Sequence, residues 1–261
     1  RNSQEVVIPA FRAAYTGRAI KEETKLTAFP AIPLPNWNIN YNGLSKIESL
    51  KTHFKSVTIR HGYQGTYNVG GYTQNVRYRG TSTGFSDQFF AIDQTTAGDT
   101  IYNIESQYII PSVSFSENFA PLAGVNMRFQ NGLAANVDLK MRRQVSMSMT
   151  NVQLTEMRSK DFTIGLSYRK DRFEKTFNLF GRTINLQNQL NSRLDVTLRD
   201  SETRNRQLDQ IGNSEVTAGN FQLIVRPSVD YSVNTKLNVR FYIEHSRNRP
   251  AISTSFPSSF T

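Results

Sequence analysis

The sequence contains no cysteine and no long run of apolar residues. Without cysteine, disulfides and thiolate metal sites are excluded. A membrane-spanning helix needs about 20 consecutive apolar residues, and with 38% apolar residues overall the chain has no such stretch. These absences exclude a helical membrane protein. They leave room for a membrane β-barrel, whose strands need an apolar residue only at every second position.

The sequence is rich in regular alternation between apolar and polar residues. Trp37, Ile39 and Tyr41 alternate with asparagines, and Val57 and Ile59 open a similar run that continues to residue 69. Comparable runs cover residues 125–130, 136–141, 145–150, 162–168, 194–198, 221–225, 229–233 and 236–244. A period of two predicts strands, and about 10 residues tilted by about 45° rise roughly 24 Å, close to the ~25 Å apolar band of outer-membrane barrels. The fold expected is all-β, an antiparallel transmembrane β-barrel or a segment of a very large one.

The two phases of these strands differ in charge. The apolar phase has almost no charged residue, as expected of a surface in lipid, where Arg or Lys at mid-membrane costs ~2–4 kcal/mol. The residues predicted to face lipid are Trp37, Ile39, Tyr41, Val57, Ile59, Val125, Met127, Phe129, Phe221, Leu223, Val225, Val239 and Phe241. Those predicted to face a water-filled lumen are Arg60, Asn126, Arg128, Asp138, Arg193 and Arg240.

Two interpretations of the lumen-phase arginines stay open. A cation-rich wall would let unfolded or acidic polypeptide pass without binding to an apolar surface. Alternatively, cross-strand carboxylates such as Asp138 or Glu244 neutralise these arginines. The net charge of +10 suggests acidic partners in general, including nucleic acid, anionic lipid and acidic polypeptide.

The connections between the predicted strands are of two kinds. Asn131-Gly132 and Asn234-Thr235 predict tight hairpin turns. Residues 85–103, 170–181 and 199–213 are polar and irregular, so we expect long surface loops there. Short turns on one side and long loops on the other are typical of outer-membrane barrels. Residues 1–35 contain four prolines and are predicted to be a connecting, plug or lid-like segment, with barrel strands over residues 36–261.

The residues that could carry chemistry do not form a recognisable site. His53, His61 and His245 are dispersed and lack the close ligand partners that a metal needs. His245 and Ser246 are neighbours, but adjacent strand residues point to opposite faces, and no G-x-S-x-G motif is present. The basic segments 140–143 and 199–206 lack the interleaved aromatics of a nucleic-acid platform. We therefore expect no enzyme, metal, cofactor or nucleic-acid partner.

Several motifs resemble a known family. They are IPAF at 8–11, AAYTG at 13–17, PLPNWNINYNGLS at 33–45, HGY at 61–63, TYNVG at 66–70, QLTE at 153–156 and ISTSFP at 252–257. In this order they are similar to the carboxy-terminal part of the SprA family, the outer-membrane translocon of the type 9 secretion system. The resemblance covers essentially the whole chain but only part of that much longer family. It implies that this chain is one portion of a larger barrel.

The resemblance also implies a function. Members of the family pass folded cargo proteins with carboxy-terminal secretion signals across the outer membrane of Bacteroidota, in some of which this export serves gliding motility. Implied partners are the secreted cargo, a PorV-type shuttle protein, a plug protein, a peptidyl-prolyl isomerase, outer-membrane lipid or lipopolysaccharide, and the rest of the barrel. The alternatives are a self-contained outer-membrane porin or receptor barrel and a soluble β-sandwich adhesin, because aromatics such as Trp37 and Tyr63 also suit a sandwich core.

Overall fold

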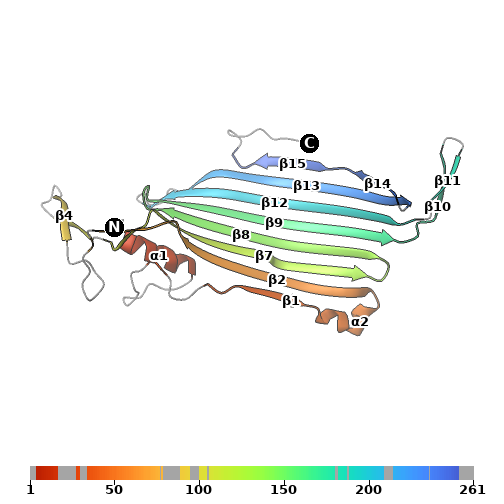
Figure 1. Ribbon diagram of the computed structural model, residues 1–261, viewed down its shortest axis with the longest axis horizontal. Helices are drawn as coiled ribbons and strands as arrows, with labels where there is room; N and C mark the ends of the chain where they lie inside the picture. The colour runs from red at the N-terminus through yellow and green to blue at the C-terminus, as the bar shows by residue number, and fades with distance from the viewer. Residues whose placement is uncertain are drawn as a thin grey trace.

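Alternation of the kind described above produces a broad antiparallel sheet (Figure 1). The computed structural model describes residues 4–16, 28–29, 34–76, 78, 89–94, 100–104, 106–179, 182–186, 188–208, 214–234 and 236–252. The sheet has nine strands: β1 (Trp37–Tyr41), β2 (Phe54–Val69), β7 (Ser112–Phe129), β8 (Leu133–Ser148), β9 (Gln153–Lys170), β12 (Leu190–Gln207), β13 (Ser214–Asn234), β14 (Leu237–Tyr242) and β15 (His245–Pro250).

Neighbouring strands pair in the order β1-β2-β7-β8-β9-β12-β13-β14, and β15 also pairs with β13. All of these pairs are antiparallel. Within the described residues, β1 has a partner on one side only, and so do β14 and β15. The all-β antiparallel prediction is thus confirmed, and the sheet is open at both edges.

Smaller elements lie at the two ends of the long strands. Between β2 and β7 the chain forms β3 (Thr73–Gln74), β4 (Phe89–Gln94), β5 (Thr100–Ile104) and β6 (Tyr108–Ile109), and between β9 and β12 it forms the hairpin of β10 (Lys175–Leu179) and β11 (Arg182–Leu186). The helices are α1 (Gln4–Thr16), the 3-10 helix η1 (Gly43–Lys46) and the short α2 (Glu48–Lys51).

The strands are longer than expected, and all three predicted long loops contain strand: β4 and β5 in 85–103, β10 in 170–181 and the end of β12 in 199–213. The described strands from β2 to β13 in the main sheet have 16 to 21 residues. β12 runs to Gln207 and β13 starts at Ser214, so most of the predicted loop at 199–213 is strand. Charged residues on both phases concealed this strand, and some of them have an ionic partner on their own face, as Arg199 does with Asp161 at 3.0 Å.

The predicted separation of short turns from long loops is also wrong. The chain turns tightly at residues 130–132, where Gly132 has a φ of 85°. Tyr168 pairs with Leu133, and Lys170 pairs with Leu190, so the β10–β11 hairpin emerges at this same end. In a meander, successive connections alternate between the two ends of the sheet, so the end at which a connection lies depends on how many strands precede it. The predicted strands did not place the β10–β11 hairpin at the correct end. We call this the turn end and the opposite one the helix end.

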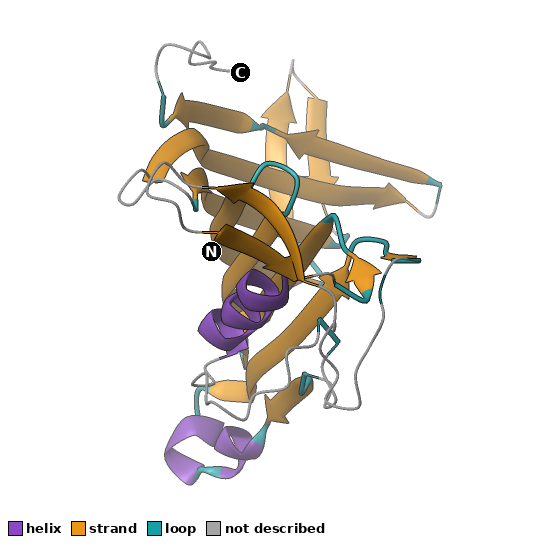
Figure 2. Cartoon of the chain, turned by 90° about the vertical axis from the view of Figure 1, so that its left-hand side faces the viewer, coloured by secondary structure: helices purple, strands orange, loops and turns teal. Residues whose placement is uncertain are grey.

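The core lies at the helix end, where α1 packs on one face of the sheet (Figure 2). Ile8 and Phe11 are buried against Phe115 and Val145, which are 2% and 0% exposed. The other core members are Ile110, Val113, Met147 and Leu154. Residues 4–16 of the predicted connecting, plug or lid-like segment are therefore a helix that contains Pro9.

Candidate functional site

The register of the strands sorts their side chains onto two contrasting faces. Residues directly opposite each other in an antiparallel pair share a face. One row across the sheet is almost wholly apolar and consists of Tyr41, Ile59, Val125, Val137, Ile164, Val196, Val225 and His245. The next row faces the other way and consists of Asn40, Arg60, Gly124, Asp138, Thr163, Thr197, Ile224 and Ser246. We call these the apolar face and the polar face.

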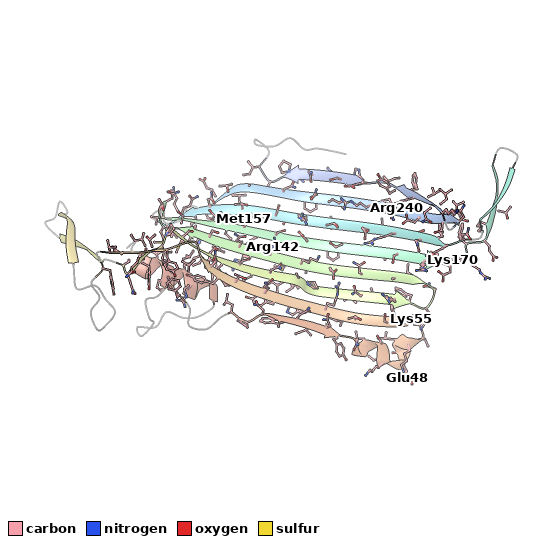
Figure 3. The ribbon with its side chains drawn as sticks, viewed as in Figure 1. Glu48, Lys55, Arg142, Met157, Lys170 and Arg240 are labelled. Carbon is pink, nitrogen blue, oxygen red and sulfur yellow. The ribbon has the colours of Figure 1, made fainter. Side chains whose placement is uncertain are left out.

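The predicted site residues follow this division without exception. Every residue predicted to face lipid lies on the apolar face, and every residue predicted to face a lumen lies on the polar face. Side chains are distributed along the whole length of the sheet (Figure 3). Several apolar ones are open to the surroundings, with Ile39 54%, Val239 50% and Phe241 64% exposed. Across the described strands the apolar face is therefore a large unpaired surface.

Aromatic side chains mark both limits of the apolar zone. Toward the helix end, Trp37 stacks on Tyr63 with ring centroids 4.4 Å apart, and Tyr63 contacts Phe119 at 4.9 Å. Toward the turn end, the rings of Phe54 and Phe129 lie 4.7 Å apart. β7 bulges between Phe119 and Ala123, so the ladder with β8 advances only about 8 positions from Phe119 to Phe129, which at ~3.3 Å each and a tilt of about 45° corresponds to roughly 19 Å. That height is somewhat below the ~25 Å apolar band of outer-membrane barrels.

The apolar zone crosses the strands obliquely. Trp37, Tyr63, Phe119 and Met141 share a row, and this row continues on β9 and β12 with Lys160 and Asp200. At the β14 edge, the apolar pairs are Phe241 with Val229 and Val239 with Tyr231, which lie nearer the turn end. An oblique zone is the pattern expected when strands tilt relative to a flat boundary.

Beyond the zone, at the helix end, the same face becomes charged. Arg143 contacts Glu156 at 2.7 Å and Glu117 at 3.9 Å, and Arg158 contacts Glu156 at 2.7 Å. We call Glu117, Arg143, Glu156 and Arg158 the charged belt. Burial alone would raise the pKa of Glu156, but the hydrogen bonds from Arg158 and Arg143 outweigh it and hold this pKa below its ordinary value.

The charged belt adjoins α1. The guanidinium of Arg143 lies over the ring of Tyr15 at 4.7 Å, and that of Arg12 lies over Tyr67 at 5.9 Å. Burial raises the pKa of Tyr67 to about 12, with Arg12 opposing the shift. Because α1 lies on the apolar face, it does not occupy the polar face, where a plug in a lumen would lie.

On the polar face, most arginines are neutralised by carboxylates. Arg60 binds both oxygens of Asp138, at 2.8 and 3.0 Å. Arg193 contacts Asp195 at 2.6 Å, Arg240 is bonded to Asp230, and the other such pairs are Arg199–Asp161 and Arg226–Glu244. Both carboxylates named from the sequence take part, Asp138 with Arg60 and Glu244 with Arg226. Among the predicted lumen-phase arginines, Arg60 and Arg240 thus have cross-strand carboxylate partners, whereas Arg193 pairs within its own strand.

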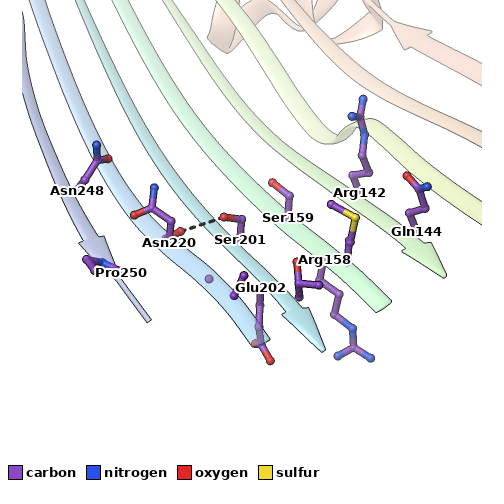
Figure 4. A pocket seen from close by; sticks show the side chains of 13 residues that line it. Arg142, Gln144, Arg158, Ser159, Ser201, Glu202, Asn220, Asn248 and Pro250 are labelled. Carbon is purple, nitrogen blue, oxygen red and sulfur yellow. Dashed lines mark hydrogen bonds between the residues drawn. The ribbon is translucent and has the colours of Figure 1, made fainter. Parts of the chain in front are cut away.

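The polar face is hollowed near the helix end. A cavity of about 610 Å³ is lined by residues of β8, β9, β12, β13 and β15 (Figure 4). Its lining includes Arg142, Gln144, Ser159, Ser201, Asn220 and Asn248. Sequence reasoning missed this cavity, because alternation reveals which face a residue joins and not which residues are small enough to leave space.

The described residues offer no evident catalytic or metal centre. They contain no group of three or more His, Cys, Asp or Glu side chains arranged to hold a metal ion. His245 and Ser246 lie on opposite faces, and the Nδ1 atom of His61 lies 2.6 Å from the Leu122 carbonyl oxygen. Within the described part of the chain, no helix combines the length and apolar character needed to cross a membrane.

No protein-family model matches the chain, and no curated protein matches it. The function is therefore argued from the two faces of the sheet and from the charges and cavity that they carry.

Proposed function

We propose that this chain forms part of the wall of an outer-membrane β-barrel that conducts protein, as the translocon of the type 9 secretion system does. The observation that carries the proposal is the two-faced sheet: a continuous apolar face bounded by aromatics, opposite a face of ion pairs, amides and hydroxyls. A barrel wall needs this division, because one side meets lipid and the other meets water.

The charge distribution supports the same assignment. The row from Ile59 through Val225 contains no charge, whereas the next row on the opposite face contains the Arg60–Asp138 pair. A soluble sheet would cover such an apolar face with a second layer. α1 packs there at the helix end, beyond the apolar zone, and near the turn end η1 contacts β2 beside Val57, which is 6% exposed. Much of the apolar face between these helices stays exposed, as at Ile59 and Phe221.

The open edges favour a larger barrel over a self-contained one. Eight strands form the continuous path of the sheet. A closed barrel of about 8 strands has an interior that side chains just fill, which leaves no passage for a protein. In the proposal, β1 and the β14–β15 edge pair with further strands, and the cargo, shuttle, plug and isomerase partners implied by the family resemblance act on that larger assembly.

The absence of cysteine permits a direct test. We introduce single cysteines as the matched neighbours Val125→Cys and Asn126→Cys, and likewise Val239→Cys and Arg240→Cys, each the only thiol in the chain. In lipid vesicles, a membrane-impermeant thiol reagent should modify the polar-face members, and a lipid-borne quencher should reach probes on the apolar-face members. The reverse pattern, or equal reactivity within each pair, would overturn the assignment.

A further inference from the structure

The cavity on the polar face has a defined shape, which a smooth conduit wall would not need. It forms where neighbouring strands carry small side chains on that face, Ser159 on β9, Ser201 on β12 and Ala218 on β13. Longer side chains stand at its rim, among them Arg142 and Gln144 of β8 (Figure 4). The volume of about 610 Å³ is within the range of about 300–1,000 Å³ that is typical of ligand pockets.

The cavity lining carries three charged side chains, Arg142, Arg158 and Glu202. Arg158 pairs with Glu156, and Glu202 is bonded to Arg204, which leaves the charge of Arg142 without a carboxylate partner among the described residues. Arginines elsewhere on the polar face, such as Arg60 and Arg199, have carboxylate partners. Among the described residues, no Asp or Glu lies within ion-pair distance of Arg142 or of Lys140, the preceding polar-face residue of β8. An anionic ligand would supply the missing partner.

The other polar groups of the cavity are not open to a ligand in the same way. The Ser201 hydroxyl donates to the carbonyl oxygen of Asn220 at 3.2 Å, and the Ser159 hydroxyl donates to Asp161 at 3.0 Å. The Oδ1 atom of Asn248 is buried, so a ligand in the cavity does not reach it. Arg142 is therefore the group with which an anionic ligand would pair.

We propose that this cavity binds an acidic segment of an extended polypeptide, with a carboxylate on Arg142. The lining runs across five neighbouring strands from β8 to β15. At about 4.8 Å between strands this is roughly 19 Å, a length that an extended segment fills and a simple anion does not. The inference rests on the proposed function, because it makes the cavity a contact point for protein passing along the polar face.

Binding of a dye-labelled peptide of alternating Asp and Ser to the purified full chain in detergent tests the proposal by fluorescence anisotropy. Arg142→Gln should weaken binding about tenfold. The matched control is Arg128→Gln, which removes the same charge from the same face, also without a carboxylate partner, but lies near the turn end, roughly 26 Å from Arg142 along the strands. Ala218→Phe, which fills the cavity without changing its charge, should weaken binding as much as Arg142→Gln.

Equal losses for Arg142→Gln and Arg128→Gln would overturn the proposal, because they would reveal a general charge effect. So would equal affinity for the matched Asn-Ser peptide, or competition by inorganic phosphate at the same concentration as the acidic peptide. The assay needs no membrane. Peptide binding with the expected variant pattern but a reversed thiol labelling pattern would retain the cavity and reject the barrel wall, and the opposite combination would reject this inference alone.

Discussion

The strongest quantitative test of the two-faced sheet compares two neighbouring residues of β12. Val196 lies on the apolar face between Ile164 and Val225, and Thr197 lies on the polar face between Thr163 and Ile224. Both are β-branched and partly exposed, and they occupy the same depth in the sheet. Val196→Arg and Thr197→Arg therefore place the same charge at the same level, on opposite sides.

The expected cost follows from the surroundings of each position. Arg on the lipid face at mid-membrane costs ~2–4 kcal/mol. From position 196 the side chain can lean toward Asp200, which lies about 13 Å along the strand, so we expect the lower part of that range, ~2–3 kcal/mol. This corresponds to a roughly 30- to 150-fold shift in the folding equilibrium. At Thr197 the guanidinium remains among the charges of the polar face, and we expect a change within about 0.5 kcal/mol.

Equilibrium unfolding in guanidinium chloride, with the protein folded into phospholipid vesicles, measures both free energies. Trp37 is the single tryptophan and stacks on Tyr63, so its fluorescence reports loss of the sheet. The reasoning is refuted if Thr197→Arg destabilises as much as Val196→Arg, or if Val196→Arg changes the free energy of unfolding by less than about 0.5 kcal/mol.

Other predictions concern single interactions. Asp138→Asn removes the bidentate partner of Arg60 and should lower the free energy of unfolding by ~1–3 kcal/mol, with a double-mutant cycle that includes Arg60→Gln isolating the pair. Phe11→Ala truncates a side chain that is 5% exposed and should release α1, seen as faster amide exchange in residues 4–16 and at a cost of ~3–5 kcal/mol to docking. Gly132→Ala combines a φ of 85° with a Cβ placed 2.6 Å from the Arg169 carbonyl oxygen, and the unfolding midpoint should fall by an amount equivalent to ~1–3 kcal/mol.

The pKa of Glu156 gives the sign of an acid effect. Because the folded-state pKa lies below the ordinary value of 4.5, the ionised carboxylate stabilises the charged belt fully above the unfolded-state pKa, and this stabilisation is lost as the pH falls through the folded-state pKa. The thermal midpoint should therefore fall below about pH 4.5, and Glu156→Gln should flatten that part of the profile. An unchanged profile in the variant would contradict a role for this carboxylate.

Alternation alone predicted the division of faces, and it did so because strand pairing preserves side-chain phase from strand to strand. Val125 and Val225 are 100 residues apart in sequence, yet both fall in the same row. Where both phases carry charge, as at Arg199 and Asp200 of β12, alternation disappears even though the strand continues. Beyond the apolar zone, the sequence pattern therefore does not reveal where the strands end.

The helix was missed for a different reason. Val7, Ile8, Phe11 and Tyr15 have the spacing of one helical face. Ile8 and Phe11 belong to the core cluster, and Val7 and Tyr15 pack against it. Pro9 hid this signal, because proline normally interrupts a helix by removing a backbone N–H. Here the apolar side chains bury enough surface against the sheet for the helix to continue through Pro9.

The edges of the sheet connect the fold to the proposed conduit. In hydrocarbon, each backbone N–H or C=O without a partner costs several kcal/mol. Besides β15, the edge strands are Trp37–Tyr41 and Leu237–Tyr242, and both of these carry apolar-face residues of the apolar zone. Pairing them with each other would satisfy these groups but would close about 8 strands around an interior that the Arg60–Asp138 and Arg193–Asp195 pairs already occupy. A wall that both seals its edges and leaves a passage therefore requires additional strands between β1 and β14.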